Sequence, residues 1–172
     1  FCYNIFLMVT GLIIIGILTR FMPHVPNFSP LVGIALFSGV YLRKKYSYLI
    51  PIVIYVISDI IIGLHGIVLF TWGSIALIYW LGHKLKTNKT PVKIATYTLI
   101  SSVIFFIVTN FGVWLQGWYS YTLGGLLKCY IAALPFFRTS LLADFIYVAV
   151  LFGTYEYILK RSRNLPQRDV AF

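Results

Sequence analysis

Two of the four acidic residues in this 172-residue chain, Asp59 and Asp144, lie inside long apolar stretches. An ionisable side chain in a hydrocarbon environment is costly unless it meets a partner or a water-filled cavity. Arg20 and Arg138 flank neighbouring apolar stretches, so we expect ion pairs between Arg20 and Asp59 and between Arg138 and Asp144. Such pairs either join helices or line a cavity, and the sequence leaves both interpretations open.

Further polar side chains are expected at the depth of these carboxylates. Asp59, Asn110 and Asp144 each lie about five residues, or roughly one and a half turns, from the same end of a predicted helix. Polar groups from at least four separate segments then converge, which favours an outward-facing pocket for a small solute. The candidate solute-binding residues are Arg20, His24, Asn27, Asp59, His65, Asn110, Trp114, Arg138 and Asp144.

Two kinds of side chain in this set suggest what the solute carries. Arg20 and Arg138 are suited to a carboxylate or phosphate, because guanidinium groups bind such anions through charge-assisted hydrogen bonds. Trp114 and Trp118 could stack on a ring, although an interfacial aromatic belt explains them equally well.

The chain lacks the sequence features of a metal site or an enzyme. His24 and His65 are not spaced as metal ligands, so neither a metal nor a cofactor is predicted. No nucleophile elbow, phosphate loop or pair of histidines one helical turn apart occurs. An intramembrane enzyme would have to use Asp59 and Asp144 as a dyad, and we predict no enzymatic activity.

The composition predicts an all-α polytopic membrane protein that forms a single domain over residues 1–172. Hydrophobic residues make up 60% of the chain, charged residues only 10%, and the mean hydropathy is +0.89. We expect about six transmembrane helices and an additional outer interfacial helix at 122–138. The predicted spans are 2–19, 30–42, 47–64, 67–83, 93–115 and 140–159.

The basic residues predict the orientation. Three clusters, within 43–45, 84–93 and 160–168, hold 11 of the 14 Lys and Arg residues and fall on one side if six helices alternate. Both termini are therefore expected in the cytoplasm, with residues 160–172 as a short basic tail. The net charge of +10 is explained by the anionic inner surface of the lipid bilayer, so no nucleic-acid partner is predicted.

Two further features concern the beginning of the chain. The run RFMPHVPNFSP, residues 20–30, contains three prolines, and irregular backbone at membrane depth is tolerated where it lines a cavity. Ala35 and Gly39 form a small-residue stripe that allows close approach of another helix, either of this chain or of a partner.

Several motifs resemble a family of small bacterial membrane proteins that is described as similar to the S components of energy-coupling factor transporters. They are RFMPHVPNFSP (20–30), TNFGVW (109–114), CYIAALPFFR (129–138) and Asp144. The resemblance implies an S-component-like bundle of six helices in the bacterial inner membrane. It would capture a vitamin or another micronutrient near the outer surface, while a partner membrane subunit and two ATPases supply the energy.

The resemblance also implies roles for individual segments. The loop 20–30 would help to close the pocket, with Arg20, His24 and Asn27 as ligand or gate residues. The first helix departs from the pattern, because Gly11 and Gly16 do not reproduce the stripe of alanines with which S components dock on their partner.

The sequence is therefore compatible with two functions. The first is a small-solute binding protein that acts as the substrate-specific component of a transporter. The alternative is a non-catalytic accessory or structural subunit of a larger membrane complex, which packs against its neighbours through Ala35, Gly39 and its aromatic surface. Whether the purified protein holds a small molecule, or occurs only with a fixed set of other chains, discriminates between them.

Overall fold

In the described part of the computed structural model, apolar stretches separated by short polar breaks form five α-helices with defined bounds. The structure describes residues 10–11, 14–15, 18–21, 26–42 and 49–163, and within these ranges the protein is all-α. A short 3-10 helix, η1, spans Thr19–Phe21. The α-helices are α2 (Leu31–Tyr41), α3 (Leu49–Ile62), α4 (Val68–Leu85), α5 (Pro91–Leu115) and α6 (Leu123–Arg163).

The helix boundaries follow ordinary capping chemistry. Thr90 caps α5, because its side-chain oxygen accepts a hydrogen bond from the Lys93 amide at 3.3 Å and Pro91 occupies the first helical turn. Gly117, with a φ of +80°, turns the chain after α5. Thr122 then accepts a hydrogen bond from the Gly125 amide at the start of α6.

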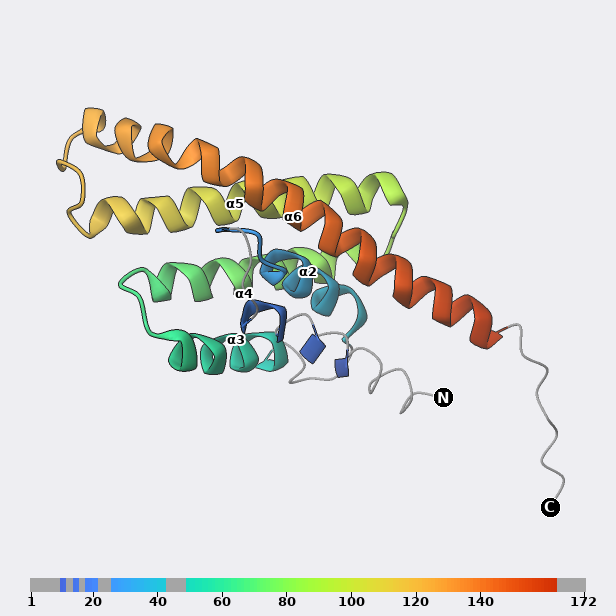
Figure 1. The fold of residues 1–172 in the computed structure, drawn as a ribbon. Coiled ribbons are helices and arrows are strands. Elements are labelled where there is room, and N and C mark those ends of the chain that lie inside the picture. Colours follow the sequence, from blue (N-terminus) through green and yellow to red (C-terminus); the bar gives the residue numbers. More distant parts are fainter. Residues whose placement is uncertain (1–9, 12–13, 16–17, 22–25, 43–48, 164–172) are drawn as a thin grey trace, which may run out of the picture.

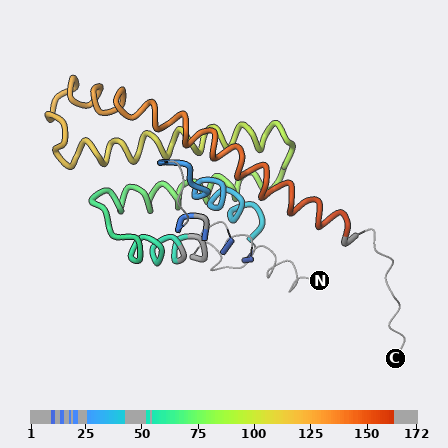
Figure 2. Tube along the Cα trace, viewed as in Figure 1, coloured from blue at the N-terminus to red at the C-terminus, as the bar shows by residue number. Residues whose placement is uncertain are grey.

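The short helix α2 lies at the centre of the bundle. It packs against α4 and α6 and also contacts α5 and α3, as Figure 1 shows. Along the chain, α3, α4 and α5 each pack against the next helix, and the tube in Figure 2 follows this up-and-down path. Every residue of α2 from Val32 to Tyr41 is buried.

Small residues allow α2 and α4 to approach each other closely. A Cβ atom on Gly39 would come within 2.9 Å of the Gly82 Cα and still closer to the Tyr79 carbonyl oxygen. Ala35, one turn earlier, is also buried in the core. The stripe of Ala35 and Gly39 therefore packs within this chain, which answers the question of whether it serves an internal or an external partner.

Aromatic side chains and one acidic group join α2 to α6 near their C-terminal ends. Phe37, Tyr41, Phe152 and Tyr155 form a cluster with ring centroids 3.9–5.6 Å apart. The Tyr41 hydroxyl donates a hydrogen bond to Glu156 at 2.5 Å. This cluster anchors the far end of the helix whose N-terminus borders the cavity described below.

Most of the predicted spans agree with the helices, but the last two segments do not. The spans 30–42, 47–64, 67–83 and 93–115 correspond to α2, α3, α4 and α5. The predicted interfacial helix 122–138 and the span 140–159 are instead one continuous helix of 41 residues, α6. No glycine follows Pro135 before 153, and a proline alone removes one hydrogen bond without ending the helix here.

Two helices, α5 and the part of α6 from Leu123 to Arg161, are long and apolar enough to cross a membrane. The expected number of six is not reached in the described part of the chain. With 11 residues, α2 extends about 16 Å at 1.5 Å per residue, about half of a hydrocarbon core. The span 2–19, the basic residues at 43–45 and the end of the tail at 164–172 fall mostly or wholly outside the described residues.

Candidate functional site

A cavity of about 760 Å³ is lined by residues from η1 and all five α-helices. The irregular segment 26–30 and the loop 63–67 complete its wall. Its polar lining consists of Arg20, Asn27, Ser29, His65, Thr71, Ser102, Thr109, Asn110, Gln116, Ser140 and Asp144. Its aromatic lining consists of Tyr55, Phe105, Phe106, Trp118, Phe136 and Phe137.

The segment 26–30 places irregular backbone at the entrance to α2. Asn27 has a φ of 63°, a left-handed conformation that asparagine adopts more readily than most residues. Pro30 stands at the N-cap of α2, and none of the described side chains caps the helix. Since Leu31 and Val32 line the cavity, the N-terminus of α2, whose first amide groups have no partner within the helix, borders it.

Arg20 and Asp59 form the predicted ion pair. Arg20 Nη2 lies 2.8 Å from Asp59 Oδ1, and Arg20 Nη1 donates to the Ser58 hydroxyl. The guanidinium also lies over the ring of Tyr55, 4.5 Å from its centroid. Trp72 Nε1 donates to the other oxygen of Asp59 at 2.9 Å, so the buried Asp59 carboxylate is satisfied on both oxygens.

Asp144 has a different environment from Asp59. It is 2% exposed and its Oδ2 lies 2.6 Å from the Ser102 hydroxyl. The predicted ion pair with Arg138 is not formed: within the described residues, no cation lies in ion-pair contact with Asp144. Six residues of α-helix separate the two side chains by about 120° around the axis, so they occupy different faces of α6.

Besides Asn110, α5 supplies two polar side chains that are not among the candidates from the sequence, Ser102 and Thr109. Ser102 contacts the Thr98 carbonyl at 3.0 Å, Thr109 donates to the Phe105 carbonyl, and Asn110 donates to the Phe106 carbonyl. These bonds within the helix satisfy the side-chain donors of Thr109 and Asn110, whereas the Ser102 hydroxyl also lies within hydrogen-bond distance of Asp144 on α6. The spacing of Ser102 and Thr109, two helical turns apart, is the sequence signal that could have identified this face.

The structure brings many of the candidate residues together, with three exceptions. Arg20, Asn27, His65, Asn110 and Asp144 line the cavity, and Asp59 stands behind Arg20. His24 lies outside the described residues. Trp114 and Arg138 do not line the cavity: Trp114 Nε1 donates to the Ser120 carbonyl at 3.0 Å, and Arg138 is exposed. Trp118 and Gln116 lie in the wall instead.

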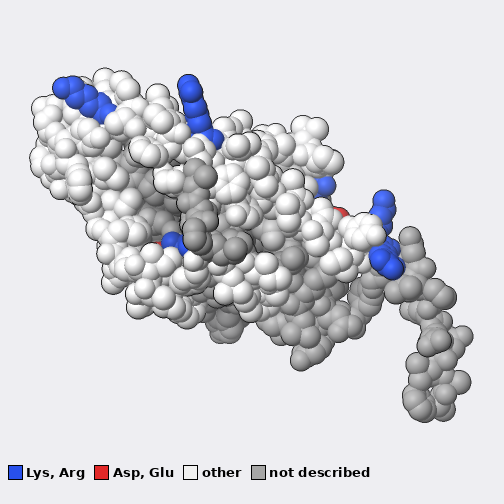
Figure 3. Space-filling model, viewed as in Figure 1, with Lys and Arg blue, Asp and Glu red and all other residues white. Residues whose placement is uncertain are grey.

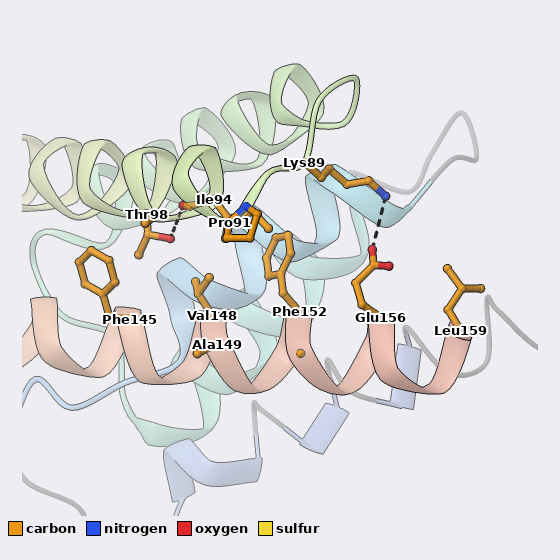
Figure 4. A pocket seen from close by; sticks show the side chains of 12 residues that line it. Lys89, Pro91, Ile94, Thr98, Phe145, Val148, Ala149, Phe152, Glu156 and Leu159 are labelled. Carbon is orange, nitrogen blue, oxygen red and sulfur yellow. Dashed lines mark hydrogen bonds and ion pairs between the residues drawn. The ribbon is translucent and has the colours of Figure 1, made fainter. Parts of the chain in front are cut away.

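A second cavity, of about 740 Å³, lies between the first half of α5 and the second half of α6 (Figure 4). Its two charged residues, Lys89 and Glu156, lie 3.6 Å apart and compensate each other at the rim. Most of its remaining wall is apolar. It has no charged group free for a ligand among the described residues, and we therefore take the first cavity as the candidate site.

The described lining of the first cavity contains no arrangement typical of a metal centre. Across the described parts of the chain, no group of three or more His, Cys, Asp or Glu residues is placed to hold a metal ion. His65 and Asp144 both line the cavity, but a solute would have to bind through hydrogen bonds, charge and aromatic contact.

Comparison with known proteins gives one match. A family model described as a family of unknown function (DUF6580) matches residues 3–167, nearly the whole chain. No curated protein and no solved structure matches the chain. Because the matching family has no stated activity, it supplies no link to the S components of energy-coupling factor transporters.

Proposed function

The chain belongs to DUF6580, a family of unknown function, and we propose that it is a membrane-embedded binding protein for a small solute. In this proposal it acts as the substrate-specific component of a transporter, without enzymatic activity. The observation that carries the proposal is the cavity of about 760 Å³, on which polar side chains from η1, α4, α5, α6 and the segments 26–30 and 63–67 converge. Cavities of this size enclose most of the surface of a small organic molecule.

The outer faces of the helices support a membrane location. In the most apolar window of both α5 and α6, only 28% of the residues are buried, unlike the core helix of a soluble protein. Much of the described surface visible in Figure 3 carries neither acidic nor basic side chains. Exposed aliphatic side chains on these two helices include Val92, Leu99, Ile107, Leu127, Ile131, Leu142, Ile146 and Val150.

The proposal includes the orientation of the chain in the membrane and the subunits with which it works. Six spans in the bacterial inner membrane, with both termini in the cytoplasm, would expose the loops 63–67 and 116–122 on the outer side, near the cavity. The irregular segment 26–30 lines the cavity, which supports a role of this segment in closing the pocket. Energy for transport would come from other subunits, as the resemblance to S components implies.

A cavity-filling substitution tests the proposal. Ala133 lines the cavity, and its neighbour Ala132 on α6 is exposed and does not. We expect Ala133→Trp to abolish retention of a co-purified solute, because the indole projects into the cavity and occupies space that the solute needs, while Ala132→Trp retains it. Native mass spectrometry of gently solubilised protein measures the bound small molecule and any co-purifying chains at once.

The same measurement can also contradict solute binding. If the wild-type protein carries no small molecule and is found only in a fixed assembly with other chains, the accessory-subunit hypothesis replaces the proposal. Equal solute retention by both tryptophan variants would show that the solute does not occupy this cavity.

A further inference from the structure

We propose that the solute is a small organic cation, a molecule with a protonated amine that pairs with Asp144. This inference rests on the proposed function and specifies its substrate class. It reverses the expectation that arginine side chains select an anionic solute. The charged residues of the described cavity lining determine which sign of charge on the solute is favoured.

Arg20 contributes little net positive charge to the cavity. Its guanidinium is paired with Asp59, which accepts a second hydrogen bond from Trp72. The two charges compensate each other, and both side chains are largely buried. An anionic solute that bound Arg20 would have to compete with a carboxylate already in place at 2.8 Å.

Of Arg20 and Asp144, the two charged residues of the described cavity lining, Asp144 has no counter-ion among the described residues. Ser102 has a single hydroxyl hydrogen, but its oxygen lies within hydrogen-bond distance of both the Thr98 carbonyl and Asp144 Oδ2. Ser102 can therefore satisfy only one of these acceptors at a time. A protonated amine supplies both the missing charge and the missing donors, which lowers the cost of the buried carboxylate.

The cavity wall favours an organic cation over a bare metal ion. Phe105, Phe106, Phe136 and Phe137 line the cavity together with Asp144. Aromatic faces attract cations and at the same time bury the apolar part of an organic molecule. A volume of about 760 Å³ is also far larger than a single ion and its first ligands require.

The N-terminus of α2 adds a partial positive charge at the cavity, but this charge is smaller than the negative charge of an ionised Asp144. A helix N-terminus carries about half a positive charge, whereas an ionised Asp144 carries a full negative charge. Ser29, just before α2, has a buried hydroxyl without a hydrogen-bond partner among the described residues. These donors suit a neutral acceptor, such as a hydroxyl or carbonyl oxygen, elsewhere on the same amine.

Matched compounds test the charge directly. Phenethylamine, phenylethanol and phenylpropionic acid share a skeleton, as do tryptamine, tryptophol and indolepropionic acid. We expect the amines to raise the unfolding temperature of the detergent-solubilised protein, with smaller or no effects from the alcohols and acids. Asp144→Asn should weaken amine binding about tenfold to a hundredfold, as expected for the loss of a charge-assisted hydrogen bond.

The outcomes separate this inference from the proposed function. If acids or alcohols bind more tightly than amines and Ala133→Trp abolishes their binding, the inference is wrong and the solute-binding function stands. If no compound of either set binds and no solute co-purifies, both are wrong. The ranking of the compounds on the wild-type protein remains decisive even if Asp144→Asn does not fold.

Discussion

Replacement of Arg20 by alanine is expected to lower the free energy of unfolding by about 3–5 kcal/mol, because it leaves the buried Asp59 carboxylate without its counter-ion. Asp59 is 1% exposed with Arg20 in place, and Trp72 would remain as its hydrogen-bond donor among the described residues. Thermal unfolding in detergent micelles measures the loss. The effect should appear with or without added solute.

A double-mutant cycle separates the ion pair from other roles of Arg20. The variant Arg20→Met with Asp59→Asn removes both charges, keeps similar volumes and leaves an amide oxygen to accept from Trp72. We expect it to be more stable than either single variant, since replacing both members of a buried pair is far less costly than removing one. Additive effects of the two single substitutions would mean that the pair is not coupled.

This expectation changes the role that the sequence suggests for Arg20. From the sequence, an arginine beside a cavity is a candidate for binding an anion, and Asp59 is a candidate for the same pocket. The structure couples the two, so Arg20 holds η1 against α3 and shapes the wall of the cavity. Sequence patterns place charges at similar depths, but they do not decide which charges neutralise each other and which stay available.

The same limit explains which site residues could be predicted. Asn110 and Asp144 stood out because polar residues are rare in apolar stretches, and Asn27 and His65 because they lie in breaks at the same end of the predicted helices. All four line the cavity. Ser102 did not, because serine is common in membrane helices and can bond to its own backbone. Its importance depends on its contact with Asp144, 42 residues away, which requires the packing of α5 against α6.

The fold was predictable where the sequence contains clear helix breaks. Gly63 and Gly117, both with positive φ, end helices near the expected positions. The boundary expected near 139 depended on Arg138 and on the interruption of the apolar stretch 122–138 by Lys128 and Pro135, and none of these residues ends the helix. With Pro135 accommodated, α6 continues for about 60 Å, twice the thickness of a hydrocarbon core.

Replacement of Gly39 by leucine is expected to cost about 3 kcal/mol or more, the upper end of the usual range for overpacking. The obstacle is the backbone of α4, since even a Cβ atom on Gly39 would lie 2.9 Å from Gly82 Cα and from His83 N. Side chains can change rotamer, but two helix backbones can separate only by disrupting the packing of α2 along its length. Thermal unfolding in detergent measures the loss.

Gly73→Leu is the matched control, because Gly73 lies on α4, the helix against which Gly39 packs, and a Cβ atom added to it would have no described neighbour within 4 Å. It should be neutral or stabilising, since leucine favours a helix by up to about 1 kcal/mol over glycine. Equal destabilisation by both substitutions would contradict close packing of α2 on α4. Because α2 begins at the cavity wall and ends in the aromatic cluster, a shift of this helix should also impair solute binding, which Gly73→Leu should leave unchanged.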